Sequence, residues 1–255
     1  MPATVSSSRP GLRTAAWVLL LLAVTCGLVF GAFAQIRYRW NWEGFWPNRM
    51  LFFQGWLATL GICAGAMVIC LAGGFALMLG SRAPWEPVRL ACRGYIAIVR
   101  ATPLLVQLLI GYYVVANALR IHDSVIVGML LLGLFEAAYL AEIFRGALES
   151  IGQSQREAAR AVGFSTWQAY RYVLVPQAVR RALPGTTGEL VSLVKNSSLL
   201  SVLGIEEVTQ ITRLINSRSY TALEGFLPLA LAYLAVTLPL SWAARRLERR
   251  FAYET

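Results

Sequence analysis

Charged residues are scarce in this sequence of 255 residues: they make up 14% of it, whereas hydrophobic residues make up 57%. A soluble domain usually has about a quarter of its residues charged. The mean hydropathy is +0.58, and the apolar residues come in long runs instead of alternating with polar ones. This composition excludes an ordinary soluble domain and predicts an all-α integral membrane protein.

Motifs of several catalytic and metal-binding classes are also missing. The chain has four cysteines and one histidine, His122, and it contains no CxxC pair, HExxH motif or GxSxG motif. These absences argue against a disulfide framework, a metal site and a membrane-embedded hydrolase. The sequence also has no Walker A motif, so any ATP that drives this protein must be hydrolysed by another chain.

The net charge of +10 does not indicate a nucleic-acid partner, because the basic residues are scattered between apolar runs instead of forming a stripe with aromatic residues. Six apolar segments approach or exceed the roughly 20 residues that a bilayer crossing requires. They are residues 15–34, 51–80, 103–119, 124–148, 186–203 and 225–244. The fifth segment is the weakest because it contains Lys195. The expected fold is therefore an N-terminal anchor helix followed by five membrane helices.

The first segment ends in Ala32-Phe33-Ala34, which resembles a signal-peptidase site. We expect an uncleaved anchor because the apolar run is long for a signal peptide. The stretch "WNWEGFW", residues 40–46, then predicts an aromatic belt at the outer membrane interface. With the N-terminus placed inside, the inner segments hold sixteen arginines and the outer segments hold six. The positive-inside rule therefore predicts that both termini are cytoplasmic.

One polar stretch, residues 151–184, does not fit a lipid-facing role. It reads as a helix that ends at Gly163, a residue that accepts a left-handed backbone. Ser165 and Gln168 form a predicted capping box for a second helix, which we expect to stop before Pro176. Pro176 and Pro184 are then expected at the starts of further helical pieces. The sequence predicts a helix–turn–helix element at the inner membrane surface.

The same stretch resembles the EAA motif of ABC-importer permeases. Glu157-Ala158-Ala159 is followed by three residues, then Gly163, then nine residues, then Val173-Leu174-Val175-Pro176. Three more stretches resemble the polar amino acid branch of this family, which serves histidine, glutamine, arginine and glutamate importers. They are "RATPLLVQLL" (100–109), "AAYLAEIFRGALESI" (137–151) and "LVSLVKNSSLLSVLG" (190–204). The resemblance covers about residues 50–250, with departures at Cys63, Ser154, Gly188 and Asn196.

The resemblance implies a permease domain over residues 51–250, preceded by a tail, anchor and outer loop over 1–50 and followed by a tail over 251–255. It implies that Glu157, Ala158, Ala159, Gly163 and Pro176 belong to a coupling loop, 151–184, that docks on a cytoplasmic ATPase subunit. ATP and magnesium would then bind to that subunit, and this chain would bind no cofactor. The other implied partners are an extracytoplasmic amino acid-binding protein, a second permease copy or paralogue, and a polar amino acid. The implied location is the bacterial inner membrane.

Ionisable residues within membrane segments are costly, so each should face a cavity or another charge. Glu142 and Arg145 are three apart on one helix, which predicts a structural ion pair. Glu136 lies midway along the fourth segment, with Tyr139 on the same helical face. Two interpretations of Glu136 stay open: a carboxylate that faces a substrate ammonium or guanidinium group, or a buried partner of Lys195.

Further candidates for the substrate pathway are Thr59, Ser197 and Ser198, the last two because they interrupt the fifth segment with hydroxyl groups. A second class of function also fits the composition, namely a secondary transporter or channel without an ATPase partner. That class is typified by inverted repeats, and the sequence has no convincing internal repeat.

Overall fold

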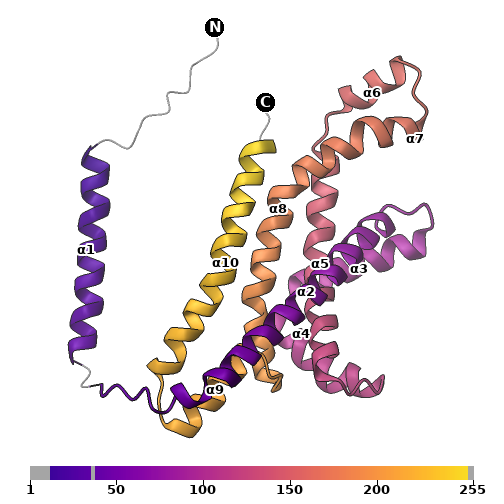
Figure 1. Ribbon diagram of the computed structural model, residues 1–255. Helices are drawn as coiled ribbons and strands as arrows, with labels where there is room; N and C mark the ends of the chain where they lie inside the picture. The colour runs from indigo at the N-terminus through magenta and orange to yellow at the C-terminus, as the bar shows by residue number, and fades with distance from the viewer. Residues whose placement is uncertain (1–11, 36–37, 252–255) are drawn as a thin grey trace. The chain divides into compact units, whose positions relative to one another are not determined.

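The computed structural model describes residues 12–35 and 38–251, and these residues contain helices and no strand (Figure 1). The chain divides into two compact units, Met1–Asn41 and Trp42–Thr255. The first unit contains one apolar helix, α1 (Leu12–Gln35), over the segment expected to be the anchor.

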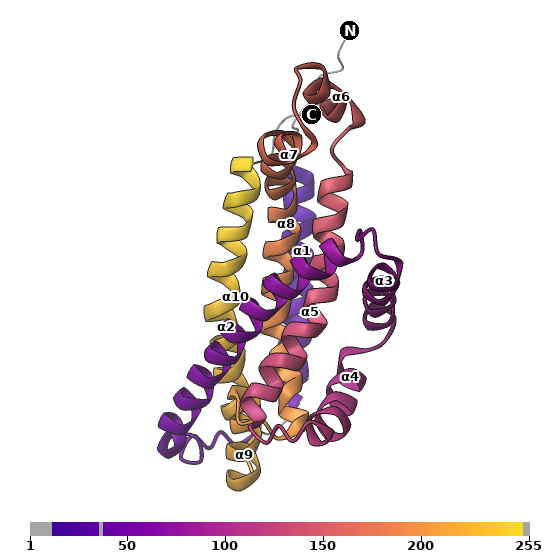
Figure 2. The ribbon, with the colours of Figure 1, turned by 90° about the vertical axis from the view of Figure 1, so that its right-hand side faces the viewer.

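The second unit holds the remaining elements. They are η1 (Trp46–Asn48), α2 (Arg49–Gly80), α3 (Glu86–Ala101), α4 (Leu104–Ile110), η2 (Gly111–Ala116), α5 (Ser124–Glu149), α6 (Gln153–Ala161), α7 (Thr166–Ala169), η3 (Tyr170–Leu174), α8 (Val175–Asn196), η4 (Ser197–Leu203), α9 (Val208–Ser219) and α10 (Leu223–Phe251). Within this unit, α5, α8 and α10 run side by side and α2 crosses them obliquely (Figures 1 and 2). The short helices α6 and α7 lie at the same end as the last turns of α10, and α9 lies at the opposite end.

Small residues let α2 and α5 approach each other closely. A Cβ atom on Gly74 of α2 would lie 2.7 Å from the Cβ of Leu140, and one on Gly133 of α5 would lie 2.7 Å from the Cβ of Ile69. Real Cβ atoms do not pack this tightly, so only glycine fits at both positions. Close packing of this kind drives helix association where lipid removes the hydrophobic driving force.

Three helices of the described chain are long and apolar enough to cross a membrane: Trp46–Gly80, Ser124–Glu149 and Leu223–Leu247. Glu86–Ala101 and Leu104–Ala116 together add a fourth if this pair, bent by 114°, is one span. The number of six spans therefore stays a prediction. The helical architecture itself is as expected.

Helix α3 was not predicted, because three arginines interrupt its apolar residues. It ends at Thr102, which has the extended backbone that a following proline favours. Pro103 cannot donate a backbone hydrogen bond, so the chain bends there. The side chain of Gln107 donates to the carbonyl of Val99 at 2.8 Å and to that of Thr102 at 3.1 Å. These bonds satisfy carbonyl groups that the break leaves without a helical partner.

The expectation that a helical piece starts at Pro176 is confirmed, because Pro176 lies in the first turn of α8. The same expectation for Pro184 was wrong, because Pro184 lies inside α8. The π-helical turn η3 precedes Pro176, and its wider turn relieves the clash between a proline ring and the carbonyl group four residues earlier. Because α8 packs against both α5 and α10, tertiary contacts hold it together across Pro184.

Candidate functional sites: a surface hairpin and buried polar groups

The hairpin, defined here as residues 151–174, turns at Gly163. The backbone of Gly163 is left-handed, with φ +85°, as the sequence predicts. Its N–H donates to the carbonyl of Arg160 at 2.9 Å, and the N–H of Phe164 donates to that of Ala159 at 3.1 Å. These two bonds form the Schellman arrangement that satisfies the last carbonyl groups of α6. A Cβ atom at Gly163 would meet nothing within 4 Å, so the glycine is required by the backbone and not by packing within this chain.

The second arm of the hairpin starts with the predicted capping box. The backbone N–H of Ser165 donates to Oε1 of Gln168 at 2.8 Å, and the N–H of Gln168 donates to Oγ of Ser165 at 3.3 Å. This reciprocal pair confirms the predicted helix start at Thr166. From there a helical path continues through η3 into α8, so the arm is mechanically continuous with a helix of the bundle.

The root of the hairpin is packed against the end of α5. Leu148, Ile151 and Leu174 form a small buried cluster there. The guanidinium group of Arg181 donates to Oγ of Ser150 at 3.0 Å and also to the Ser150 carbonyl. The hairpin is therefore attached to both α5 and α8.

The tip of the hairpin exposes large apolar side chains. The exposed fractions are 71% for Val162, 70% for Trp167 and 65% for Tyr172. Within the EAA motif, Glu157 and Ala158 are exposed and Ala159 is buried. Arg160 and Arg171 lie among these residues in the sequence and are also exposed. The tip thus presents an apolar and basic surface that the sequence reasoning had not identified residue by residue.

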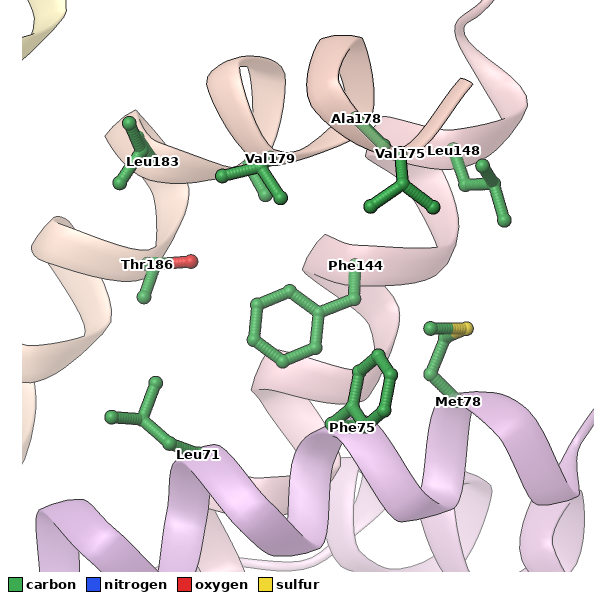
Figure 3. Close-up of a pocket in the computed structure, with 11 residues that line it drawn as sticks. Leu71, Phe75, Met78, Phe144, Leu148, Val175, Ala178, Val179, Leu183 and Thr186 are labelled. Carbon is green, nitrogen blue, oxygen red and sulfur yellow. The ribbon is translucent and has the colours of Figure 1, made fainter. Parts of the chain in front are cut away.

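An apolar cavity of about 280 Å³ lies between α2, α5 and α8 next to the root of the hairpin (Figure 3). Phe75 and Phe144 point into it from two helices, and Val179 faces them from α8. Thr186 is its one polar lining residue. A polar amino acid would find almost no hydrogen-bonding groups here, so this cavity is not a candidate substrate site.

Glu136 is completely buried, and its partner is Asn196, not Lys195. The side-chain amide of Asn196 donates to Oε1 of Glu136 at 2.8 Å. Lys195 is exposed, and among residues 12–35 and 38–251 no ion pair to it is present. The prediction of a Glu136–Lys195 pair was therefore wrong. Consecutive residues on a helix point about 100° apart, so Asn196 and Lys195 cannot both face α5.

A second acidic residue lies near Glu136. Glu189 sits two helical turns before Asn196 on the same face of α8, and it interacts electrostatically with Glu136. The other carboxyl oxygen of Glu136, Oε2, is buried and has no hydrogen-bond partner among the described residues. Two carboxyl groups and an amide therefore meet between α5 and α8, and one carboxyl oxygen, Oε2 of Glu136, has no hydrogen bond to the described residues. This combination suits a group with several N–H donors.

The other candidates for the substrate pathway are not gathered around Glu136. The centroid of the Tyr139 ring lies 5.1 Å from that of Phe135, with the two rings tilted by 42°, and 5.8 Å from the guanidinium carbon of Arg100. The hydroxyl groups of Ser197 and Ser198 each donate to a carbonyl group three residues earlier at 2.8 Å. These two serines stand where α8 gives way to the 3₁₀ helix η4, as the sequence suggested.

Thr59 belongs to a separate network around Glu207, a residue that sequence reasoning missed. Glu207 is fully buried and caps α9, because its Oε1 accepts from the N–H of Gln210 at 2.8 Å. Its Oε2 accepts from the hydroxyl groups of Tyr233 at 3.2 Å and of Thr59 at 3.4 Å. This network joins α2, α9 and α10. The only signal in the sequence was an acidic residue at the start of a helix.

The predicted Glu142–Arg145 ion pair is confirmed, with Nε of Arg145 2.8 Å from Oε1 of Glu142. The structure extends it on both sides. Arg100 of α3 lies 2.9 Å from Oε2 of Glu142, and Arg145 also pairs with Glu149, which pairs with Arg82 at the end of α2. The pair therefore belongs to a chain of charges that ties α2, α3 and α5 together.

Comparison with known proteins adds three findings. Residues 72–253 match the family described as "Binding-protein-dependent transport system inner membrane component". The glutamine transport system permease protein GlnP of Escherichia coli (strain K12) is 37% identical over 220 residues, which cover 83% of this chain and 98% of that protein. The octopine transport system permease protein OccM of Rhizobium radiobacter is 39% identical over 179 residues, covering 67% and 71%.

A solved structure shares the fold and much of the sequence. It is described as the crystal structure of an amino acid ABC transporter with histidines, and it is similar to this chain with a TM-score of 0.77 and 30% sequence identity. The match covers 84% of this chain and 100% of the other. The match therefore extends over most of both chains.

Proposed function

The chain belongs to the family of binding-protein-dependent transport system inner membrane components, and from this premise we propose that it is the permease subunit of an ATP-driven importer of polar or charged amino acids. The hairpin carries this proposal. It combines the EAA sequence with a rigid turn and with an apolar tip at one end of a membrane bundle. A segment that served only to lie in water would not expose Val162, Trp167 and Tyr172 together.

In this proposal the hairpin docks on a cytoplasmic ATPase subunit. Glu157 and Ala158 lie on the docking surface, while buried Ala159 holds α6 in place and Gly163 sets the turn. Pro176 marks the junction where motion of the hairpin enters α8. ATP and magnesium are bound by the partner subunit, and this chain itself carries out no catalysis.

The other proposed partners follow from the same assignment. An extracytoplasmic binding protein delivers the amino acid at the end of the bundle where α9 lies, and a second permease copy or paralogue completes the pathway. The location is the bacterial inner membrane, with the hairpin and both termini in the cytoplasm. In a variant without native cysteines, an impermeant outside reagent should label a cysteine placed at His122 and not one placed at Ser165. The reverse labelling pattern would contradict this orientation.

For the substrate, we propose that Glu136, Asn196 and Glu189 lie at the pathway and bind the ammonium or guanidinium group of the amino acid. The unused oxygen of Glu136 and the neighbouring Glu189 support this assignment, because a cationic donor group offsets two acidic groups. Tyr139, Thr59, Ser197 and Ser198 are now proposed to have positioning roles, since the structure engages each of them in other contacts.

The proposal is tested by reconstituting the chain in proteoliposomes with the ATPase and binding protein encoded beside it. Uptake of labelled glutamine, glutamate, histidine or arginine should require ATP on the hairpin side and the binding protein on the other. The alternative function is a secondary transporter or channel. Uptake by this chain alone, driven by an ion gradient and indifferent to ATP, would establish that alternative and reject the proposal.

A further inference from the structure

A second cavity, of about 340 Å³, lies between α3 and α5 beside the end of α2. Its size falls in the range of roughly 300–1,000 Å³ that is typical of small-molecule sites. Unlike the apolar cavity near the hairpin root, it is lined largely by charged groups. The lining residues are Ser81, Arg93, Ile96, Ala97, Arg100, Glu142, Arg145 and Glu149.

The charges around this cavity do not balance. Glu142 and Glu149 are the acidic residues, and both are already paired with arginines: Glu142 with Arg100 and Arg145, and Glu149 with Arg145 and Arg82. The lining therefore holds three arginines, Arg93, Arg100 and Arg145, against two carboxylates, which leaves an excess of one positive charge, and Arg82 adds a further positive charge beside the cavity.

Arg93 has N–H groups that donate to no acceptor in the described chain. It has no carboxylate partner, and its one hydrogen bond to the described chain runs from Nε to the carbonyl of Ser81 at 3.0 Å. Both terminal nitrogens of its guanidinium group are therefore available. Nearby, Nε of Arg82 is buried without an acceptor. Guanidinium groups bind phosphate and carboxylate oxygens well, because their N–H groups match that geometry in pairs.

The helix that carries Arg93 also exposes apolar side chains. On α3, the side chains of Leu90 and Ile98 are 59% and 67% exposed, and Trp85 just before the helix is 67% exposed. Arginines beside exposed aliphatic and tryptophan side chains are typical of the membrane interface, where headgroups and acyl chains meet. The cavity also lies at the end of α5 that leads into the hairpin, which the arginine distribution places in the cytoplasm.

We propose that this cavity binds the phosphate group of an anionic phospholipid of the inner leaflet, with Arg93 as the main contact. An acyl chain then lies along Leu90, one turn from Arg93 on α3, and the excess positive charge selects anionic over zwitterionic lipid. A bound lipid would join α3 to α5 by adding an anion to the arginines that already link them. This inference does not depend on which amino acid the protein transports.

The experiment measures phospholipid retained by the full-length chain, co-purified with its ATPase subunit, using native mass spectrometry during titration with phosphatidylglycerol or phosphatidylcholine. Arg93→Gln should weaken the binding of one phosphatidylglycerol roughly tenfold to a hundredfold, as expected for the loss of charge-assisted hydrogen bonds. Arg89→Gln is the matched control. Arg89 lies one turn earlier on α3, pairs with Glu86 at 3.7 Å and does not line the cavity.

The Arg93→Lys variant guards against a folding defect, because it keeps the positive charge and should retain most of the binding. Phosphatidylcholine binding should be the same in all variants. Equal phosphatidylglycerol binding by the wild type and Arg93→Gln would overturn the proposal, as would an equal loss in Arg89→Gln. Displacement of the lipid by excess inorganic phosphate would show a site for free anions instead, and would reject the lipid as its occupant.

Discussion

The hairpin and the buried polar groups are both unusual, but in opposite ways: the hairpin exposes apolar side chains, and the bundle buries acidic ones. The hairpin exposes Val162, Trp167 and Tyr172 at the end of the bundle, whereas the bundle encloses fully buried acids, among them Glu136 and Glu207. Exposed apolar surface and buried charge are each unfavourable in isolation. The exposed apolar side chains therefore indicate a binding role. The buried carboxyl groups indicate either a functional role or a hydrogen-bond network that offsets the cost of burying them.

The two regions also differ in how their shapes are held. The hairpin is fixed by hydrogen bonds between residues three to five positions apart, as at Gly163 and Ser165. The buried acids are held by residues far away in the sequence: 60 positions separate Glu136 from Asn196, and 148 separate Thr59 from Glu207. Local damage should therefore impair the hairpin's function without unfolding the chain, whereas damage at the buried acids should affect assembly.

The largest effect is expected from Gly163→Val. A β-branched residue at φ +85° costs about 1–3 kcal/mol of backbone strain, so the turn should distort and displace the exposed tip. Because the position has open space around it, the bundle itself should stay folded. Uptake by reconstituted protein should fall by at least roughly tenfold. A displacement of about 1 Å in a group that must be precisely positioned can lower a rate by far more than the loss of one contact would.

The control for this change is Gly163→Asn, because asparagine tolerates a left-handed backbone better than other residues with side chains. It should retain most of the uptake. Full uptake by Gly163→Val in an assembled complex would show that the turn has no part in coupling.

The next effect concerns the assembly of the bundle. Asn196→Leu removes the amide that donates to Glu136 and leaves a buried carboxyl group unsatisfied, which costs about 1–3 kcal/mol or more. The yield of folded protein and its thermal unfolding temperature in detergent should both fall. Lys195→Gln is the control, and it should leave both unchanged because Lys195 is exposed. Equal damage from the two changes would revive the discarded Glu136–Lys195 pair.

Glu136→Gln separates the structural role of this residue from its proposed role in transport. Glutamine can still accept the hydrogen bond from Asn196, so assembly and basal ATPase activity should survive. Loss of the negative charge should lower uptake roughly fivefold to tenfold, because a charge-assisted hydrogen bond is about twice as strong as a neutral one. The exposed Glu206→Gln is the control. Unchanged uptake in Glu136→Gln would limit Glu136 to a structural role.

The smallest effect is expected at Tyr233→Phe. This change removes one hydroxyl group that contacts Glu207 at 3.2 Å and Thr209 at 2.9 Å. Glu207 keeps its bonds to Gln210 and Thr59, so the free energy of unfolding should fall by only about 1 kcal/mol. Tyr172→Phe, at an exposed tip position, should have no measurable effect on unfolding. A loss of several kcal/mol at Tyr233 would mean that the network is less redundant than its contacts indicate.

The sequence allowed the hairpin to be predicted because its signals are local. A glycine at the end of a helix and a serine three residues before a glutamine specify their own hydrogen bonds. Helix α3 was missed because its arginines hide an apolar face, and the path through Pro184 depends on packing against α5 and α10. The partner of Glu136 depends on the rotation of α8, which a single sequence does not specify. Nothing in the sequence indicated that Glu207 is buried.

The hairpin tip is proposed to be the surface that contacts an ATPase subunit. A photo-crosslinking amino acid at Trp167 tests this proposal directly in the assembled complex, with Tyr220 as the control. Tyr220 is 97% exposed and lies just after α9, at the opposite end of the bundle. We expect an adduct with the ATPase subunit from position 167 and none from position 220. An ATPase adduct from position 220 alone, or none from position 167 in a complex that still transports, would contradict it.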